Sequence, residues 1–454
     1  MEEVLKINPL LIRKYNLQLP KYTSYPPVSF WDNYLAPNLW SANFQKEFNN
    51  NNHTEGISIY IHLPFCESLC TYCGCNKKIT TDHTIEDEYL LAIEKEWKLY
   101  RNLMQQTPVI REIHLGGGTP TFFSPRNLKR LVSLILKNSI VHPAHEFSVE
   151  GHSGHTTGKH LEILYSMGFR RISYSVVDID IEIQRIINRI QPFEKVENAA
   201  KMAREAGFTS VNFELLYGLP KQTNQSFEKT IEQSLTLMPD RIAFEKYTHV
   251  PWAKKSQRLF DENDLPAVEE KIRMYTRGKE MLMQHGYVDI GMDQFTLAGD
   301  SLYKAWKKGK IHRNFMGYSA QNTGLLLGLG VSAFSDTGTA LAQNIKSLHD
   351  YFASISNNQL AIKKGYILNE EDALFRKNIL DISCRGKTSF GEKQSSLLEQ
   401  YIFPKLALLA FDGLVSYDMA GLEVSRLGHF FIRNICNAFD IHSHRAKIIS
   451  NKAV

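Results

Sequence analysis

The sequence has few cysteines and no long hydrophobic segment. Its six cysteines in 454 residues are too few and too unevenly placed for the disulfide framework of a secreted protein. No uninterrupted apolar run reaches about 18 residues, and the start, MEEVLKINPLLIRKYN, lacks the basic region and apolar core of a signal peptide. We therefore expect a cytoplasmic protein without a membrane span, in a compartment that keeps thiols reduced.

Long blocks of like charge, repeats and low-complexity tracts are also missing. The formal net charge is +5, a mild excess that indicates no nucleic-acid partner, because no basic stripe is interleaved with aromatic residues. The chain is 43% hydrophobic and long enough for a large core and more than one domain.

Strand-like and helix-like segments alternate through the first two thirds of the chain. The expected strands are 56–64, 109–118, 146–152, 170–178, 209–220 and 241–249, and helices are expected at 84–102, 125–138, 196–208 and 226–238. Such βα units in series predict parallel strands with right-handed crossovers, in an open sheet or in a full or partial barrel.

The first expected strand has one apolar and one polar face. Positions 57, 59, 61 and 63 are apolar, whereas positions 58, 60 and 62 are polar, and the strands at 146–152 and 209–220 alternate in the same way. A barrel with helices outside and an aqueous or ligand-filled interior explains this pattern. The alternative is a set of buried polar groups that pair with one another.

Four cysteines lie together in CESLCTYCGC, directly after the first expected strand. A structural zinc site would need a second cysteine pair, which the sequence does not offer. Thiolates at Cys66, Cys70 and Cys73 can bind three irons of a [4Fe–4S] cluster and leave the fourth iron open for a ligand outside the protein. Cys75 could close that corner, but two residues after Cys73 in an extended segment it should point the other way.

These residues carry a family resemblance. The C-x3-C-x2-C spacing with Tyr72 before the third cysteine is similar to the signature of the radical S-adenosylmethionine (SAM) superfamily, and HLGGGTP is similar to its glycine-rich segment. More narrowly, the chain resembles the oxygen-independent coproporphyrinogen III oxidase (coproporphyrinogen dehydrogenase) family over nearly its whole length. The resemblance rests on PKYTSYPP, YIHLPFCESLCTYCGCNKKIT, LGGGTPTFF, QRIINR, LLYGLPKQT, GMDQF, HRNFMGY, GLGVSAFS and FIRNICNAFD.

The resemblance implies an α/β fold with a partial (β/α)6 radical SAM barrel. We expect an N-terminal extension at 1–50, the radical SAM catalytic domain at 51–350, and a smaller, mainly helical, winged-helix-like lid domain at 351–454. Helices are expected at 372–384 and 395–415 and a hairpin at 414–425. Cys384 and Cys436 stand alone in apolar helices, where small buried hydrophobes are expected.

The resemblance also implies a site. A [4Fe–4S] cluster is bound by Cys66, Cys70 and Cys73, and Cys75 is a catalytic candidate that handles a proton or hydrogen atom. The expected SAM contacts are Tyr60, Gly117, Gly118, Thr119, Glu150, Arg189, Glu214, Thr248 and Gln321. The glycines would let the backbone approach SAM, while Glu150 would accept from its ammonium and Arg189 would pair with its carboxylate. The plainer alternatives are a locally satisfied Tyr60 hydroxyl and a surface salt bridge for Arg189.

The implied reaction is the oxidative decarboxylation of two propionates of coproporphyrinogen III to vinyl groups, which gives protoporphyrinogen IX in anaerobic haem biosynthesis. It needs an electron donor such as flavodoxin or ferredoxin, and a monomer is expected. Several positions on the predicted lumen surface depart from the family pattern: Gly151, His152, Ser153, Val177, Glu214, Glu245 and Lys246, of which the last two add a charge pair. The departures keep two alternatives open. One is a paralogous radical SAM enzyme that acts on another tetrapyrrole or transfers a methyl group, and the other is a non-catalytic haem or cluster carrier.

Overall fold

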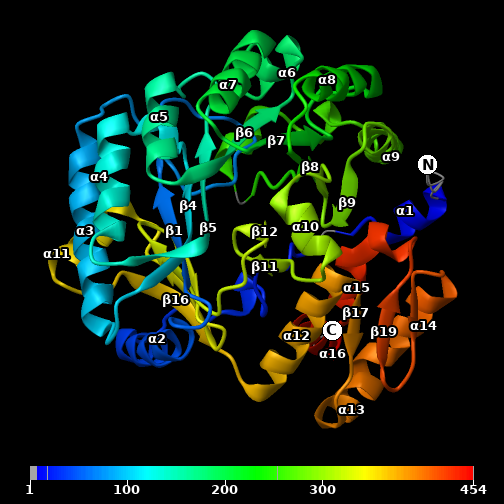
Figure 1. Ribbon diagram of the computed structural model, residues 1–454. Helices are drawn as coiled ribbons and strands as arrows, with labels where there is room; N and C mark the ends of the chain where they lie inside the picture. Colours follow the sequence, from blue (N-terminus) through cyan, green and yellow to red (C-terminus); the bar gives the residue numbers. More distant parts are fainter. Residues whose placement is uncertain (1–7, 18, 253, 453–454) are drawn as a thin grey trace.

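The computed structural model describes residues 8–17, 19–252 and 254–452 (Figure 1). All six predicted strands are present and pair in parallel in chain order, which confirms the partial barrel. They are β1 Ile57–Leu63, β4 Val109–Gly117, β5 Ile140–Gly151, β6 Phe169–Val177, β7 Ser210–Tyr217 and β8 Arg241–Lys246.

Helices connect these strands and cover the outer face of the sheet (Figure 1). They are α3 Ile85–Leu103, α4 Pro125–Leu136, α5 Gly158–Ser166, α6 Ile181–Ile186, α7 Phe193–Glu205, α8 Asn224–Thr236 and α9 Val268–Gln284. In α4 the Ser124 side chain accepts a hydrogen bond from the Asn127 backbone N–H, and Pro125 occupies the first turn, where its missing N–H does no harm. The buried residues of α4 recur at helical spacing on one face: Leu128, Leu131, Val132 and Ile135.

The sheet extends beyond the six predicted strands to twelve. β13 Leu326–Leu329 pairs in parallel with β1, and β14 Phe334–Asp336, β15 Ala340–Asn344 and β16 Ile362–Ile367 continue antiparallel from it. At the other edge β10 Gln294–Thr296 pairs with β8, and β9 Val288–Gly291 follows. The domain boundary at residue 350 stays a prediction, but the sheet itself continues to Ile367.

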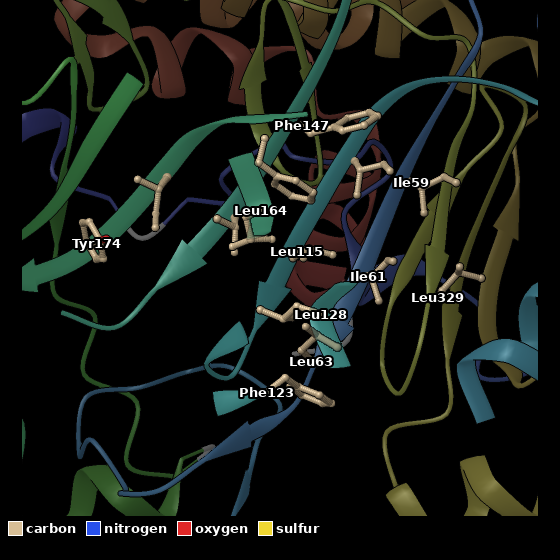
Figure 2. Packing of buried hydrophobic residues seen from close by; sticks show 14 of the residues in the cluster. Ile59, Ile61, Leu63, Leu115, Phe123, Leu128, Phe147, Leu164, Tyr174 and Leu329 are labelled. Carbon is tan, nitrogen blue, oxygen red and sulfur yellow. The ribbon is translucent and has the colours of Figure 1, made fainter. Parts of the chain in front are cut away.

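The main hydrophobic core lies between the sheet and its helices. The apolar face of β1 belongs to it: Ile59, Ile61 and Leu63 lie on the same side of the sheet as Leu115 of β4, the side on which Leu128 of α4 packs (Figure 2). Helix α2 Pro37–Asn51, part of the expected N-terminal extension, adds Trp40, Phe44 and Phe48, all fully buried. The N-terminal residues thus contribute to the same core as the barrel.

The C-terminal region has a second core with helices and a three-stranded sheet. Its elements are α12 Glu370–Arg385, β17 Lys387–Ser389, a helical run from α13 Ser395–Leu397 through a π-turn to α14 Phe403–Phe411, β18 Val415–Tyr417, β19 Gly421–Val424, α15 Ile432–Ala438 and α16 Ile441–Lys452. The predicted helices and hairpin are confirmed. Cys384 and Cys436 are buried in this core, as expected.

The remaining short helices and strands lie outside the elements described above. They are α1 Pro9–Tyr15, α10 Ser301–Lys307, the hairpin β11 His312–Asn314 with β12 Gly317–Ser319, α11 Leu348–Ser356, and the two-residue strands β2 Phe65–Cys66 and β3 Lys78–Ile79. Within the described ranges, every helix is too short or too polar to cross a bilayer.

We expect Phe44→Ala to destabilise the protein by about 3–5 kcal/mol, because the fully buried ring, which packs on Tyr100 of α3, leaves a cavity between α2 and α3. Urea unfolding followed by circular dichroism measures the change. Leu39→Ala is the matched control on the same helix: its side chain is 56% exposed, so its effect should stay within about 0.5 kcal/mol. Equal effects of both variants would contradict this packing.

Candidate functional site

The four clustered cysteines lie in the loop that follows β1. The short strands β2 and β3 close the loop by pairing in parallel, with Cys66 opposite Ile79. On the other side the backbone N–H of Thr71 donates to the Ile187 carbonyl at 2.9 Å, and the Asn188 side-chain amide donates to the Leu69 carbonyl at 2.8 Å. The end of α6 therefore fixes the cysteine loop above the carboxyl ends of the parallel strands.

Polar groups from three segments reach the predicted cluster ligands. The Thr119 hydroxyl lies 3.3 Å from Cys66 Sγ, and Arg189 Nη1 lies 3.5 Å from Cys70 Sγ. The pKa of the Cys73 thiol is lowered to about 5, chiefly by a hydrogen bond from the Cys75 thiol, against the effect of burial and with help from Lys77. A thiolate, the form that binds iron, is thus favoured at Cys73.

Cys75 does not point away from Cys73, and that prediction is wrong. The two side chains are hydrogen-bonded, and the bond raises the pKa of the Cys75 thiol while burial raises it further. The alternation rule fails because residues 71–75 form a turn and bend instead of an extended segment. Whether Cys75 acts in catalysis stays a prediction.

The residues fit a cluster better than a single metal ion. Across the described ranges, no three histidine, cysteine or acidic side chains converge closely enough to hold one ion. A [4Fe–4S] cube takes one thiolate at each of three separate irons and needs no such convergence. The three thiols on one anchored loop, with the cation of Arg189 beside them, therefore fit the cube.

A chain of hydrogen bonds follows the polar face of β1. The Tyr60 hydroxyl is 2.9 Å from His62 Nδ1, and His62 Nε2 is 2.8 Å from the carbonyl oxygen of Asn76 in the cysteine loop. The ring of His114 stacks on Tyr60 with centroids 5.9 Å apart. The Tyr60 hydroxyl is therefore satisfied locally, as the plainer alternative expects, and it also belongs to the wall below the cysteine loop.

Glu150 is held at the centre of this wall. His114 Nε2 lies 3.1 Å from one carboxylate oxygen, and the backbone N–H of Gly117 donates to the other at 3.1 Å. Burial alone would raise the pKa of Glu150, but the hydrogen bond and charge of His114 and the amide of Gly117 lower it. Glu150 is therefore a carboxylate at neutral pH, and its side chain is 39% exposed.

The missing side chains of the three glycines make room for neighbouring protein groups. A Cβ atom at Gly116 would lie 2.9 Å from Glu150 Oε1, and one at Gly117, where φ is +117°, would lie 2.8 Å from the His62 ring. At Gly118 it would lie 2.6 Å from the Pro64 backbone. The glycines thus bring the ends of β1 and β4 together, and a direct contact of Gly117 or Gly118 with SAM stays a prediction.

Arg189 and Glu214 meet at Ser175 on β6. Arg189 Nε and Nη2 donate to the Ser175 carbonyl at 3.1 and 2.9 Å, and the Ser175 hydroxyl donates to Glu214. Burial, and then the charge of Glu150, raise the pKa of Glu214 to about 7. Arg189 forms no ion pair among the described residues, so the salt-bridge alternative does not account for it.

One expected SAM contact, Gln321, lies apart from this group. Gln321 accepts a hydrogen bond from Arg111 Nε at 2.7 Å, at the beginning of β4, whereas the cysteine loop follows the opposite end, six residues or roughly 20 Å along the strand. The structure therefore does not bring Gln321 to the site; Phe315 and Met316 pack beside Tyr60 instead. Thr248 is exposed and lies beside the cysteine loop, because the Gln257 side-chain amide donates to the carbonyls of both Thr248 and Tyr72 at 3.3 Å. Its contact with SAM stays a prediction.

The lower half of the lumen follows the alternative of internally paired polar groups. Glu112 accepts from the hydroxyls of Ser58 and Ser319, both at 2.8 Å. Arg241 is 2.8 Å from Asp300. The two hypotheses for the polar strand faces therefore describe different halves of the barrel: paired groups below, and a wall of ligand-binding groups above.

The substitutions relative to the family pattern do not all face the lumen. Glu245 pairs with Lys21 at 2.6 Å, while Lys246, the next residue of β8, donates to Asn16 on the opposite face at 2.6 Å. The predicted charge pair is thus formed with Lys21 and not within the strand, because successive side chains alternate.

The remaining departures have structural partners of their own. Val177 is buried in a small apolar cluster beside Tyr72, a Cβ at Gly151 would face Tyr174 outside the barrel, and Ser153 donates to Gln191 at 3.0 Å. His152 packs its ring 4.5 Å from that of His155.

Sequence reasoning missed His114 and Ser175. His114 could have been found, because it shares the inward parity of Gly116 within HLGGG. Ser175 accepts the hydrogen bonds of Arg189 through its backbone carbonyl. Every residue has such a carbonyl, so the sequence could not single out Ser175.

The barrel and its cysteine loop define a radical SAM domain, and a model of the radical SAM superfamily matches residues 60–233. Proteins named oxygen-independent coproporphyrinogen III oxidase are similar over the whole chain. The Pseudomonas aeruginosa protein is 34% identical over 95% of both chains, and that of Escherichia coli K12 is 36% identical over 95% of this chain and 94% of its own.

A solved structure agrees with these comparisons. Coproporphyrinogen III oxidase from Escherichia coli, described as a radical SAM enzyme, superposes with a TM-score of 0.88 at 34% identity, over 97% of this chain and all of that one. The chain belongs to the oxygen-independent coproporphyrinogen III oxidase family. Membership of the radical SAM superfamily brings a [4Fe–4S] cluster and SAM as cofactors.

We expect Cys75→Ser to retain the iron of the anaerobically reconstituted protein, because the three thiolates that fit the cube remain. Cys66→Ser, Cys70→Ser and Cys73→Ser should each lose most of it. Iron and sulfide per chain, with the visible absorption, provide the measurement. Cys436→Ser, a buried cysteine of the C-terminal core, controls for loss of a thiol. Iron loss in Cys75→Ser as large as in the other three would make Cys75 a ligand.

We expect the free energy of unfolding of the cofactor-free protein to decrease as the pH rises from 5 to 8, partly because of Glu214. With its pKa raised to about 7, the folded state keeps a proton that the unfolded chain, with a carboxyl pKa of about 4.3, releases. Glu214→Gln removes this loss. The free energy of unfolding of the variant minus that of the wild type should therefore be about 1–3 kcal/mol larger at pH 8 than at pH 5.

Melting temperatures at several pH values measure this dependence. Glu245→Gln is the matched control with the opposite sign: burial opposes, but Lys21 lowers the pKa of Glu245, so losing this carboxylate should reduce stability above pH 5. Parallel pH profiles of Glu214→Gln and the wild type would contradict the assignment.

Proposed function

We propose that this chain catalyses the oxidative decarboxylation of two propionates of coproporphyrinogen III to vinyl groups, which yields protoporphyrinogen IX in anaerobic haem biosynthesis. The observation that carries the proposal is the anchored three-cysteine loop above the wall formed by Tyr60, Glu150 and Arg189, in a chain whose full-length relatives have this name.

When bound, the reduced cluster and SAM supply a carbon-centred radical that removes hydrogen from the substrate. The protein contributes position and charge. Cys66, Cys70 and Cys73 would hold the cluster. Their loop is fixed on one side by hydrogen bonds to the residues after α6 and on the other by the pairing of β2 with β3.

Two fixed charges would orient SAM. Arg189 is locked by two hydrogen bonds to the Ser175 carbonyl, so its remaining donors can pair with the SAM carboxylate at little entropic loss. Glu150 keeps a negative charge at neutral pH because its pKa is lowered, and it can accept from the SAM ammonium. Glu214 would accept from the SAM ribose, and it does so best as a carboxylate.

The site would work with a tetrapyrrole and an electron donor such as flavodoxin or ferredoxin, in a cytoplasmic monomer. The C-terminal domain would cover the mouth of the barrel as a lid and exclude water. The SAM-facing charges favour an enzyme over a carrier, because a haem or cluster carrier needs neither a fixed Arg189 nor a charged Glu150. Full-length similarity to the oxidases favours vinyl formation over methyl transfer.

The decisive experiment supplies the reconstituted protein with reductant, SAM and coproporphyrinogen III without oxygen. We expect 5′-deoxyadenosine together with products that have lost one and then two CO2, detected by mass spectrometry. Deoxyadenosine without vinyl products would indicate another substrate. Neither product from a protein with an intact cluster would overturn the enzymatic proposal. Arg189→Ala is expected to retain iron but lose at least ten-fold in SAM affinity.

A further inference from the structure

A cavity of about 130 Å³ lies on the outer side of β8. Its lining comes from α1, α9, the turn between β9 and β10, and the start of α15, which meet near the N-terminus in Figure 1. Lys246 and Tyr217 line it from the outer faces of β8 and β7, whereas Glu245 faces the other way. The cavity therefore lies on the outer face of β8, and the charge of Glu245 on the inner face still acts on Arg433.

Cations outnumber anions in the cavity. Its charged lining consists of Lys246, Lys271, Lys279, Arg433, Asp289 and Asp293. Lys279 pairs with Asp289 at 2.6 Å and Arg433 with Asp293 at 2.7 Å. That leaves Lys246 and Lys271, neither of which forms an ion pair within the described ranges; the ammonium of Lys246 donates to Asn16 Oδ1.

Buried polar atoms in the same cavity remain unsatisfied. The Arg433 Nε–H donor and His429 Nδ1, which donates or accepts according to the ring tautomer, have no hydrogen-bond partner among the described residues. Burial lowers the pKa of both Lys246 and Lys271, and the positive charges of Lys271 and Arg433 lower that of Lys246 further. Buried donors and like charges of this kind are unfavourable unless an acceptor reaches them.

The turn that lines the cavity is strained. Met292 and Asp293 have φ values of +48° and +65°, and they are the two central residues of the β9–β10 hairpin, where such values favour Asn or Gly. The segment GMDQF thus places a bulky residue and an acid in the left-handed region. The turn holds Asp293 against Arg433 and so fixes the guanidinium beside the two lysines.

We propose that this cavity binds a small oxyanion, a carboxylate or phosphate group of a ligand, between Lys246, Lys271 and Arg433. Such a group offers two or three acceptor oxygens, which match two ammonium groups and the free Nε of a guanidinium. The site joins α1, the barrel and the C-terminal domain, so its ligand would stabilise their contact. The proposal stands independently of the proposed reaction, because the cavity lies on the other side of β8.

Binding to the full-length reconstituted protein tests the proposal. Inorganic phosphate and malonate are titrated by calorimetry against a chloride background of equal ionic strength, and melting temperatures are recorded in parallel. We expect at least one of the two to bind the wild type and raise its melting temperature. Lys246→Gln with Lys271→Gln should weaken that binding at least ten-fold. Phosphate binding alone would indicate a phosphate ligand, and binding of both would indicate a general carboxylate or phosphate site.

Lys363→Gln with Lys364→Gln, on β16 at the opposite edge of the sheet, is the matched control and should bind like the wild type. If the test variant does not fold, Arg433→Lys replaces it, since it keeps the charge and loses the Nε donor. The proposal is overturned if neither anion binds the wild type above chloride, or if the test variant that folds binds as tightly as the wild type.

Discussion

The lumen of the barrel buries Glu112, Glu146 and Arg241, and a buried charge is tolerated only when hydrogen bonds or a partner charge compensate its lost hydration. Arg171 lies 3.0 Å from Glu146, Arg241 lies 3.8 Å from the same carboxylate, and Glu112 accepts from two serines. This pairing closes the floor of the lumen. The site above it therefore has a rigid base. In that base the Ser148 hydroxyl of β5 lies 2.8 Å from His114 Nδ1 and fixes the ring.

At the upper end of the lumen the compensation is incomplete. Arg189 reaches the Cys70 thiol but pairs with no carboxylate among the described residues. Burial raises the pKa of Glu214, and the negative charge of Glu150 raises it further. The cation of Arg189 therefore calls for an anionic ligand group, and the acids Glu150 and Glu214 call for a cationic or hydrogen-bond-donating one. The polar face of the strands therefore stabilises the fold in the lower half of the lumen, where its groups pair with one another, and is available for ligand binding in the upper half.

The sequence pattern was sufficient for the features that depend on periodicity. The two faces of β1, the order of the six strands and the position of the cysteine loop follow from alternation and from βα spacing. Features that depend on tertiary contacts were not predictable. β13 to β16 are three to six residues long; β13 pairs with β1, and β14, β15 and β16 each pair with the strand before it. Gln321 is drawn to Arg111, and the turn at 71–75 brings Cys75 toward Cys73.

The N-terminal PKYTSYPP segment lies outside the predicted site, yet its contacts give it a role. Lys21 pairs with Glu245 at the rim of the barrel, its carbonyl accepts from Arg313 at 2.9 Å, and the hydroxyl of Tyr22 is 3.1 Å from Asp440 in the C-terminal domain. One short stretch thus ties the mouth of the barrel to the domain proposed to cover it. Because the Tyr22 hydroxyl is buried, separating the two parts would expose its ring and leave Asp440 without this donor. The N-terminal segment therefore holds the C-terminal domain, the proposed lid, against the barrel, and a displacement of that domain has to break or move these contacts of residues 20–27.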